Sequence, residues 1–291
     1  MKIGIIGLGL IGGCLGIDFR AAGHTVYGLA RKEASCQQAI ARGIVDAAST
    51  HIESLCPCEV IFVCTPIATI VSMVKQLAAA LSPTTIITDV GSVKAAIATE
   101  ATQHWPQFVG GHPMSGKSEA GLEAAEAGLF QGNPYVITPI ESADVHTDLA
   151  AVEVIEQLAK QLGSRLYRCA PHAHDRAVAW ISHLPVMVSA NLIEVALREP
   201  DPQTRALAQH LASSGFRDTS RVGGGNPELG LMMAQYNQAE IVRSLKRYQQ
   251  AIADTIGYLE AEDWAKLSEK LTQTKAGRSL FVEARPDPSA T

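Results

Sequence analysis

Short apolar runs alternate with amphipathic segments through the first half of the chain. Seven runs are rich in β-branched or aromatic residues and have the length of strands: Lys2–Ile6, Thr25–Leu29, Val60–Cys64, Thr84–Asp89, Phe108–Gly110, Tyr135–Thr138 and Arg165–Arg168. Several are apolar without alternation, as is typical of strands buried on both faces of a parallel sheet. Leu10–Ala22, Ile67–Leu81 and Leu149–Leu162 lie between them with the apolar spacing of helices. This alternation predicts an α/β fold with a doubly wound, Rossmann-type parallel sheet.

The pattern changes after about Ala170. The later apolar segments have helical spacing, and no convincing strand follows Arg168: Pro171–Leu197, Arg205–Ser213, Gln238–Leu259 and Asp263–Leu271. Pro185 is expected to kink or interrupt the first of these helices. We therefore predict a dinucleotide-binding domain over residues 1–168 and an all-helical domain over residues 169–282. Residues 283–291 contain two prolines and few apolar groups, and we expect a disordered tail there.

Composition narrows the class of protein. The chain has 291 residues, 47% of them hydrophobic, with a net charge of −5 and no long basic run. These values favour a globular protein and argue against binding to nucleic acid or to a membrane surface. The longest uncharged apolar stretch, Ile3–Ile17, is too short to span a bilayer and does not read as a signal peptide. Six scattered cysteines without zinc-ligand spacing predict a cytoplasmic protein with no disulfide framework and no bound metal.

A glycine fingerprint follows the first predicted strand. Gly7, Gly9 and Gly12 form GxGxxG at the start of the next helix. The first glycine allows the tight turn, the second lets a pyrophosphate approach the backbone, and the third lets the helix pack on the strand. The pyrophosphate then lies against free N–H groups of the helix N-terminus. We therefore expect a dinucleotide to contact Gly7, Gly9, Leu10, Ile11 and Gly12.

The end of the second predicted strand distinguishes the two common dinucleotides. NAD sites place an acidic residue there to bind the ribose 2′-hydroxyl. This chain has Arg31 and Lys32 instead, while Glu33 lies beyond the end of the strand. A guanidinium can hold a 2′-phosphate with two parallel hydrogen bonds. The sequence therefore favours NADP over NAD as the cofactor, with Arg31 and Lys32 as its ligands.

Polar residues follow the carboxyl ends of later strands, where ligands bind in such sheets. Thr65 and Pro66 follow the third predicted strand and are expected to line the cofactor cleft. Ser92 follows the fourth and His112 follows the fifth. An imidazole with an ordinary pKa of about 6.5 can accept a proton near neutral pH. We interpret His112 as a proton acceptor with Ser92 as its orienting partner, and we expect activity to fall at acid pH near that pKa.

Four polar residues of interest lie in the long apolar segment that opens the helical half. His172 and His174 are two residues apart and face different sides of a helix, so a metal pair is not expected. Asp175 is interpreted as a helix cap. His183 stands among apolar residues and needs a partner, which could come from the protein or from a substrate.

Two arginines follow at Arg217 and Arg221. Their spacing of four would place both on one face of a helix, where two guanidiniums could hold a dicarboxylate. The alternative is a solvated face on which Asp218 neutralises Arg217. Spacing alone leaves both interpretations open.

Five motifs together resemble one enzyme family, in the family's order and spacing: GLGLIGG at residues 7–13, DVGSVK at 89–94, GGHPMSG at 110–116, AWISHLP at 179–185 and GFRDTSR at 215–221. The chain is similar in this respect to the prephenate/arogenate dehydrogenases of tyrosine biosynthesis, over roughly residues 1–275. It most resembles the short, single-function cyanobacterial members that use arogenate and NADP.

The resemblance implies a homodimer formed through the helical domain and an oxidative decarboxylation of a small-molecule substrate. It implies that His112 accepts the substrate's hydroxyl proton while hydride passes to NADP, and that Ser92 hydrogen-bonds nearby. It places Arg217 and Arg221 around the substrate carboxylates and His183 in the substrate pocket. The implied reaction converts arogenate to tyrosine.

Three alternatives stay open. Some relatives that prefer prephenate have Glu where this chain has Ser118, and some have Trp where it has Gly230, so oxidation of prephenate to 4-hydroxyphenylpyruvate is less favoured. A different 3-hydroxyacid dehydrogenase would usually place a lysine in a mid-chain helix, and Pro171–Leu197 contains none. A dinucleotide-sensing regulator would keep the glycine fingerprint without needing His112.

Overall fold

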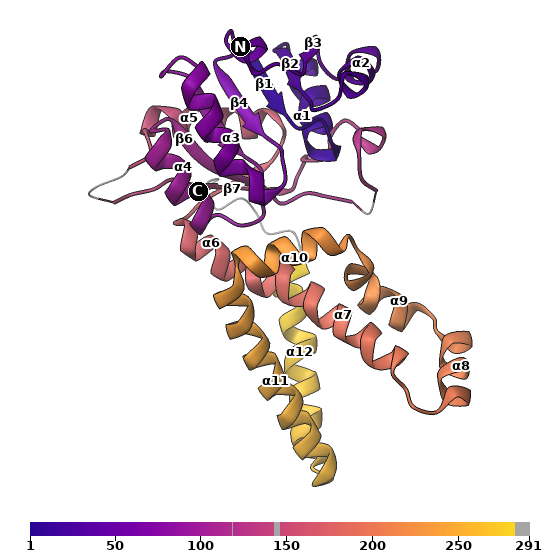
Figure 1. The fold of residues 1–291 in the computed structure, drawn as a ribbon. Coiled ribbons are helices and arrows are strands. Elements are labelled where there is room, and N and C mark those ends of the chain that lie inside the picture. The colour runs from indigo at the N-terminus through magenta and orange to yellow at the C-terminus, as the bar shows by residue number, and fades with distance from the viewer. Residues whose placement is uncertain (118, 143–145, 283–291) are drawn as a thin grey trace. The chain divides into compact units, whose positions relative to one another are not determined.

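The computed structural model describes residues 1–117, 119–142 and 146–282. The chain packs as two compact units, one spanning residues 1–237 and a second that begins at Gln238 (Figure 1). Ser118 and the expected tail from residue 283 lie outside the described residues. The predicted boundary between residues 168 and 169 falls inside the first unit, which holds both the sheet and the helices up to Tyr236.

An eight-stranded sheet forms the centre of the first unit. Its strands are β1 (Lys2–Ile6), β2 (Thr25–Leu29), β3 (Ala47–Ser49), β4 (Val60–Val63), β5 (Ile86–Asp89), β6 (Phe108–Pro113), β7 (Pro134–Thr138) and β8 (Arg165–Arg168). They lie in the order β3-β2-β1-β4-β5-β6-β7-β8. The pairs from β3 to β6 are parallel, β7 runs antiparallel to β6, and β8 is parallel to β7. Strand order reverses between β1 and β4, so a crevice for a ligand opens at their carboxyl ends.

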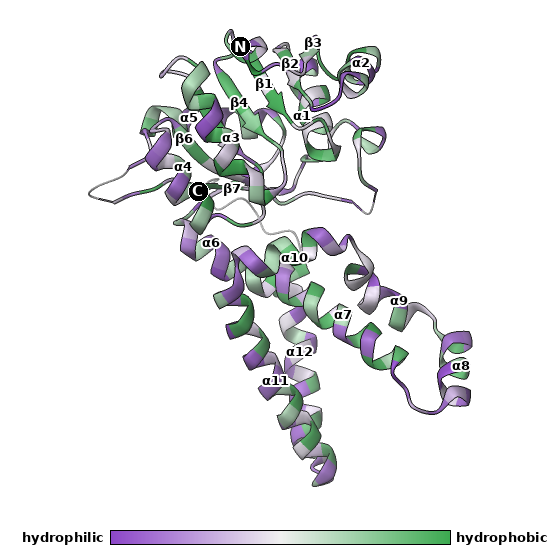
Figure 2. Cartoon of the chain, in the orientation of Figure 1, coloured by the Kyte–Doolittle hydropathy of each residue, from purple (hydrophilic) through white to green (hydrophobic). Residues whose placement is uncertain are grey.

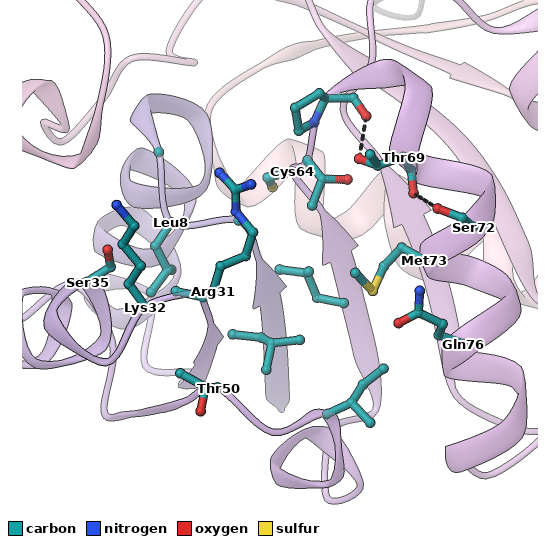
Figure 3. Close-up of a pocket in the computed structure, with 18 residues that line it drawn as sticks. Leu8, Arg31, Lys32, Ser35, Thr50, Cys64, Thr69, Ser72, Met73 and Gln76 are labelled. Carbon is teal, nitrogen blue, oxygen red and sulfur yellow. Dashed lines mark hydrogen bonds between the residues drawn. The ribbon is translucent and has the colours of Figure 1, made fainter.

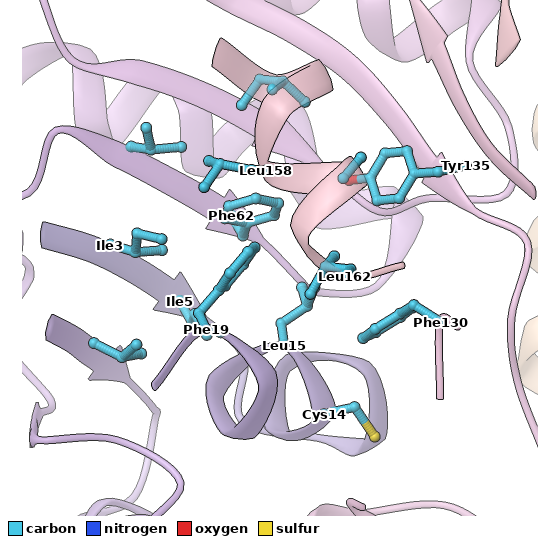
Figure 4. Close-up of a cluster of buried hydrophobic side chains, with 14 of the residues drawn as sticks. Ile3, Ile5, Cys14, Leu15, Phe19, Phe62, Phe130, Tyr135, Leu158 and Leu162 are labelled. Carbon is cyan, nitrogen blue, oxygen red and sulfur yellow. The ribbon is translucent and has the colours of Figure 1, made fainter. Parts of the chain in front are cut away.

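Helices cover both faces of this sheet. They are α1 (Leu10–Ala21), α2 (Glu33–Ala41), α3 (Ile67–Ala80), α4 (Ala95–His104) and α5 (Leu149–Gln161), with short 3₁₀ turns at Ile52–Leu55 and Leu122–Ala124. One core packs α1 and α5 on the sheet, with the rings of Phe19 and Phe62 5.1 Å apart (Figure 4). The other packs α3 and α4 on the opposite face around Val74 and Trp105. Burial on both faces explains the unbroken apolar strands.

The predicted Rossmann-type fold class is confirmed, with differences in detail. All seven predicted strands are present, and β6 continues past Gly110 to Pro113. Strand β3 was not predicted because it consists of three small residues with no β-branched or aromatic side chain. Helices α2 and α4 were also missed, since their apolar positions are few and interrupted by polar residues.

The rest of the first unit is helical. It contains α6 (Pro171–Val178), a wide π turn (Ala179–His183), α7 (Leu184–Leu197), α8 (Pro202–Leu211), α9 (Ser214–Ser220), a 3₁₀ turn (Arg221–Gly224) and α10 (Pro227–Tyr236). Pro185 lies in the first turn of α7, directly after the π turn, so the expected interruption is present. No strand follows Arg168 within the residues that the structure describes.

The segment Pro171–Leu197 is long and apolar enough to cross a membrane by length and composition alone. Core helices of soluble proteins pass the same test. Its first half buries three polar side chains, His174, Asp175 and His183, that have hydrogen-bond partners within the protein. This half therefore has the character of a packed core helix.

The second unit begins with α11 (Gln238–Glu260) and α12 (Trp264–Val282). A tight turn joins them, in which Glu262 has a φ of 50°. Lys270 Nζ donates to the carbonyl oxygen of Ala251 at 2.9 Å and links the two helices. Hydrophobic residues recur along both helices (Figure 2), and several are exposed in the single chain: Ile252, Ile256, Leu259, Trp264, Leu271, Leu280 and Phe281.

Candidate active site

A cavity of about 710 Å³ lies at the carboxyl ends of β1, β2 and β4 (Figure 3). Gly7, with a φ of +93°, makes the turn out of β1, and a Cβ there would lie 2.6 Å from the carbonyl oxygen of Cys64. A Cβ on Gly12 would overlap the carbonyl oxygen of Gly7, so only glycine lets α1 approach this closely. A Cβ on Gly9 would meet nothing within 4 Å, so the space beside this residue is open.

This arrangement fits the pyrophosphate of a dinucleotide. Gly7 and Gly9 line the cavity, whereas Leu10, Ile11 and Gly12 form the first turn of α1 behind the lining. The first N–H groups of a helix lack partners within it, and their partial positive charge attracts an anion. The residues at this end of the sheet can therefore hold the group that the fingerprint predicts.

The far end of the cavity is basic. Arg31 and Lys32 line it and are exposed, and Ser35 in the first turn of α2 lies beside them (Figure 3). None of the eighteen lining residues is acidic, and Glu33 is not among them. Thr65 and Pro66 line the cavity after β4. The Oγ1 atom of Thr65 is buried without a hydrogen-bond partner in the part of the chain that is described.

His112 lies in β6, beyond the neighbouring ends of β4 and β5. It is 8% exposed, and its Nδ1 is 2.8 Å from Nε2 of His174 in α6. Burial holds the pKa of His112 well below 6.5, and the neighbouring His174, Lys94 and His183 lower it further. The sequence predicted an ordinary pKa near 6.5 for His112, and burial, which disfavours the charged ring, places this pKa lower.

Asp175 anchors this pair of imidazoles. Its Oδ1 lies 2.8 Å from Nδ1 of His174 and accepts the backbone N–H of Lys94 at 2.7 Å, while its Oδ2 accepts the backbone N–H of Ala95 at 2.8 Å. The expected cap is present in a different place, because the carboxylate caps the start of α4 and not its own helix. The chain Asp175–His174–His112 joins α6 to the sheet through buried hydrogen bonds.

A buried ion pair fixes the loop beneath His112. Lys94 Nζ contacts Oδ2 of Asp89, and both side chains are fully buried. Burial lowers the pKa of Lys94, while the adjacent Asp89 carboxylate acts in the opposite direction. Asp89 also accepts the backbone N–H groups of Gly91 at 2.8 Å and Gly111 at 3.2 Å. The ends of β5 and β6 are therefore held together at one edge of the sheet.

His183 is fully buried in the π turn. Nδ2 of Asn237 lies 2.9 Å from the carbonyl oxygen of Asp175 and 3.1 Å from Nδ1 of His183. An amide nitrogen only donates, so Nδ1 of His183 accepts and Nε2 carries the hydrogen of the neutral ring. Nε2 has no partner among the described residues. Burial lowers the pKa of His183 to about 4, so the ring is a neutral donor at pH 7.

Unpaired hydroxyl groups gather at this edge of the sheet. Oγ of Ser92 follows β5 and Oγ of Ser115 follows β6, and neither has a partner in the described part of the chain. The hydroxyl of Tyr135 in β7 is also buried without one. Buried polar atoms are usually hydrogen-bonded, so these unpaired groups are available to a bound water or a ligand. Ser92 makes no hydrogen bond to His112 in this structure.

Arg217 and Arg221 are placed differently. Arg217 lies in α9 with its side chain 74% exposed and its Nε 3.1 Å from Oδ1 of Asp218, as the solvated alternative expects. Arg221 begins the following 3₁₀ turn and is exposed. That turn packs on α7, where the N–H of Gly223 donates to Oγ of Ser189 at 2.8 Å. The structure does not bring either arginine into the hydrogen-bond network of His112. Gly230 lies in α10, with open space where a side chain would begin.

Four residues near these sites were not assigned a role from the sequence. Asn237 gave no signal beyond its polarity, Lys94 was recognised only as the last residue of the DVGSVK motif, and Ser35 is an ordinary serine after the basic pair. His174 was weighed only as a metal ligand with His172. The signal was its position beside Asp175 in the apolar segment that also carries His183, where every buried polar group needs a partner.

Two family models match the chain almost end to end. The model described as the nucleotide-binding domain of prephenate dehydrogenase matches residues 15–168. The model described as its dimerization domain matches residues 170–273.

Individual relatives agree with these matches. The crystal structure of Synechocystis arogenate dehydrogenase is 48% identical, with a TM-score of 0.87 over 97% of this chain and 100% of that one. Prephenate dehydrogenase of Bacillus subtilis is 29% identical over 266 residues, which are 89% of this chain and 70% of that protein. Prephenate dehydrogenase from A. aeolicus, in complex with hydroxyphenyl propionate and NAD+, has a TM-score of 0.90 over 97% of this chain and 98% of that one. At 24% identity the last shows a common fold.

Proposed function

Because this chain belongs to the prephenate/arogenate dehydrogenase family, we propose that it converts arogenate to tyrosine by oxidative decarboxylation with NADP as hydride acceptor. The observation that carries the proposal is the position of His112. This buried imidazole lies on the sheet edge that also carries the cofactor cavity, among hydroxyl groups that lack partners. A base and a hydride acceptor on one edge are what the oxidation of a substrate alcohol requires.

The substrate is a cyclohexadienol with a carboxylate on C1 and a hydroxyl on C4. His112 accepts the hydroxyl proton at the nitrogen that faces the substrate. Bound NADP would supply the acceptor for the hydride that leaves C4. The C1–carboxylate bond then breaks, its electron pair makes the ring aromatic, and carbon dioxide leaves, so the reaction is effectively irreversible.

Other side chains hold the substrate in place. Ser92 offers an unpaired hydroxyl after β5, the strand next to the one that carries His112, and His183 offers an unpaired Nε2–H donor. Arg217 and Arg221 are proposed to bind the two carboxylates of the substrate as charged hydrogen-bond donors. Such fixed contacts orient the C4 hydrogen toward the cofactor. No metal ion is proposed for this chemistry.

NADP is favoured by the basic end of the cavity. Arg31, Lys32 and the hydroxyl of Ser35 can surround a 2′-phosphate at the start of α2. A site for NAD would place an acidic residue against the ribose, and no lining residue is acidic. The A. aeolicus protein was crystallised with NAD+, so NAD is the alternative to be tested.

Arogenate is favoured over prephenate by similarity to the Synechocystis arogenate dehydrogenase. Gly230 stands where some relatives have a Trp, and Ser118, where some prephenate-preferring relatives have a Glu, lies outside the described residues. Prephenate oxidation is the second candidate because the B. subtilis relative is a prephenate dehydrogenase. The two substrates differ only by an amine or a keto group on the side chain.

We also propose that the chain functions as a cytoplasmic homodimer. The helical region matches a dimerization domain, and exposed apolar side chains lie on α7, α11 and α12. Val195 and Leu197 on α7 are more than half exposed in the single chain. Exposed apolar surface of this kind is typical of an interface between subunits. In this proposal residues 1–168 form the nucleotide-binding domain and residues 169–282 form the helical domain.

Product analysis tests the proposed reaction. Purified protein with arogenate and NADP is expected to form tyrosine, carbon dioxide and NADPH in equal amounts. A dinucleotide-sensing regulator would form none of them. A 3-hydroxyacid dehydrogenase would instead reduce the cofactor with small hydroxyacids and leave arogenate unchanged, and either result would contradict the proposal.

A further inference from the structure

The two imidazoles and one carboxylate behind the proposed base allow the hydrogen positions to be worked out. Both oxygens of Asp175 already accept backbone N–H groups, at 2.7 Å from Lys94 and 2.8 Å from Ala95. The carboxylate also lies at the start of α4, where the helix dipole favours negative charge. Asp175 is therefore an acceptor toward His174, and the hydrogen of that contact lies on Nδ1 of His174.

A neutral imidazole has one N–H group and one lone pair. Since Nδ1 of His174 carries the hydrogen, its Nε2 carries the lone pair. That atom lies 2.8 Å from Nδ1 of His112, so the hydrogen of this second contact lies on His112. A charged ring is disfavoured at His112, because burial and the nearby Lys94 lower the pKa of this imidazole.

The consequence concerns the other nitrogen of His112. Its Nδ1 donates to His174, so its Nε2 keeps the lone pair. We propose that His174 and Asp175 are positioning residues that hold His112 in the Nδ1–H tautomer and leave Nε2 as the atom that accepts the substrate's proton. This inference rests on the proposed function for its chemistry, but the tautomer itself is a property of the protein alone.

The same contacts stabilise the product of proton transfer. When Nε2 of His112 gains a proton, the positive ring still donates through Nδ1 to His174, and His174 donates to Asp175. In serine proteases a buried carboxylate orients an imidazole and stabilises the imidazolium in the same way. Here a second imidazole stands between the carboxylate and the base.

The proposal explains why His183 cannot take over the role of His112. Asn237 donates to Nδ1 of His183, so the free nitrogen of His183 is a donor. The two buried histidines thus have opposite tautomers, because His174 accepts from His112 whereas Asn237 donates to His183. One offers a lone pair and the other an N–H group.

The direct test is nitrogen NMR on the full-length protein labelled with ¹⁵N-histidine, without substrate or cofactor. Long-range ¹H–¹⁵N spectra distinguish the protonated ring nitrogen from the unprotonated one. We expect His112, identified by loss of its signals in His112→Asn, to show a protonated Nδ1 and an unprotonated Nε2 near pH 8. The opposite tautomer would overturn the proposal.

Three variants test what sets the tautomer. His174→Leu removes the acceptor and is expected to leave His112 in a mixture of tautomers. His174→Gln can place an amide oxygen near the lost Nε2 and is expected to keep the Nδ1–H form. His172→Leu is the matched control, because His172 is exposed on the same helix and belongs to no part of the site.

Kinetics of the same variants test the catalytic consequence. His174→Leu is expected to lower kcat by about 10- to 100-fold, less than the roughly 10⁴-fold loss seen when a triad histidine takes the wrong tautomer. KM for the substrate should change by less than about threefold, and His174→Gln should recover most of kcat, because it restores an acceptor. Equal losses in the Leu and Gln variants, or none in either, would overturn the proposal. Absence of turnover in the wild-type protein would contradict the proposed function instead, while the NMR result would still decide the tautomer.

Discussion

Two regions are proposed to contact the substrate: the edge of the sheet at His112 and the arginine segment at Arg217 and Arg221. Their surroundings differ. His112 is 8% exposed and hydrogen-bonded to a buried partner, whereas the side chain of Arg217 is 74% exposed and pairs with an equally exposed neighbour. Exposed ion pairs of that kind contribute about 0–1 kcal/mol. The buried groups have fixed geometry before any ligand arrives, while the guanidiniums are free to reorient.

This difference separates two tasks. The groups that do chemistry need fixed orientation, because proton transfer depends on distance and angle. The groups that capture a substrate with two carboxylates need charge and reach, which exposed guanidiniums supply. Substitutions at the buried edge should therefore lower kcat, and substitutions in the arginine segment should raise KM.

The largest effect is expected from His112→Asn. Asparagine keeps hydrogen-bonding capacity but has no basic nitrogen, so kcat should fall by about 10²- to 10⁴-fold. In the wild-type protein kcat/KM should fall only below pH 6.5, because burial lowers the pKa of His112. That acid limb should vanish in the variant, while NADP affinity and the activity of the control His172→Asn should hardly change. A variant that keeps more than about a tenth of kcat with its acid limb intact would show that another group is the base.

Arg221→Ala is expected to raise the KM for substrate by about 10- to 100-fold, because a charged hydrogen bond contributes about 1.5–3 kcal/mol. Its kcat should change little, and NADP affinity measured by titration should be the same. Arg198→Ala is the matched control, since Arg198 is an equally exposed arginine whose partner is Glu194 in its own helix. An unchanged KM, or a loss of folded protein, would mean that Arg221 has a structural or solvated role.

The cofactor end offers a second exposed arginine. Arg31→Asp removes a ligand of the 2′-phosphate and supplies an acceptor for the ribose hydroxyl. The ratio of kcat/KM with NADP to that with NAD should fall by about 10- to 100-fold, again on the scale of one charged hydrogen bond. KM for the substrate at saturating cofactor serves as the internal control. The assignment of NADP to this residue would be wrong if the ratio did not move.

The smallest expected effect is on stability. Burial lowers the pKa of His183 to about 4, below the roughly 6.5 of the unfolded chain. Between these values the unfolded state binds a proton that the folded state does not, so the free energy of unfolding decreases as the pH falls from about 6.5 to 4. His183→Gln should reduce this loss by about 2 kcal/mol in urea unfolding at pH 7 and pH 4. The exposed control His172→Gln should not alter the pH dependence of the free energy of unfolding. If His183→Gln also leaves this pH dependence unchanged, burial of His183 does not destabilise the protein at low pH.

The fold was largely predictable because the strands that build its centre are apolar on both faces. Runs such as Val60–Val63 need no tertiary information to be recognised. The three small residues of β3 and the weakly amphipathic α4 gave no such signal, since their places depend on packing against neighbours.

The glycine turn was also predictable, because Gly7 and Gly12 answer local steric needs that the spacing reveals. The partners of His112 were not. His174 is 62 residues away in the chain, and only the packing of α6 against α4 and β7 brings the two rings together. For the same reason His112 was expected to have an ordinary pKa, whereas burial and the neighbouring His174, Lys94 and His183 lower it.

The proposed function is tested most directly by comparing kcat/KM for four combinations, arogenate or prephenate with NADP or NAD. The account predicts the highest value for arogenate with NADP, at least about tenfold above both prephenate with NADP and arogenate with NAD, which corresponds to about 1.4 kcal/mol of discrimination. A higher value for prephenate, or for NAD with either substrate, would contradict the assignment of substrate or cofactor. If neither cofactor is reduced in any combination, the proposed dehydrogenase activity is wrong.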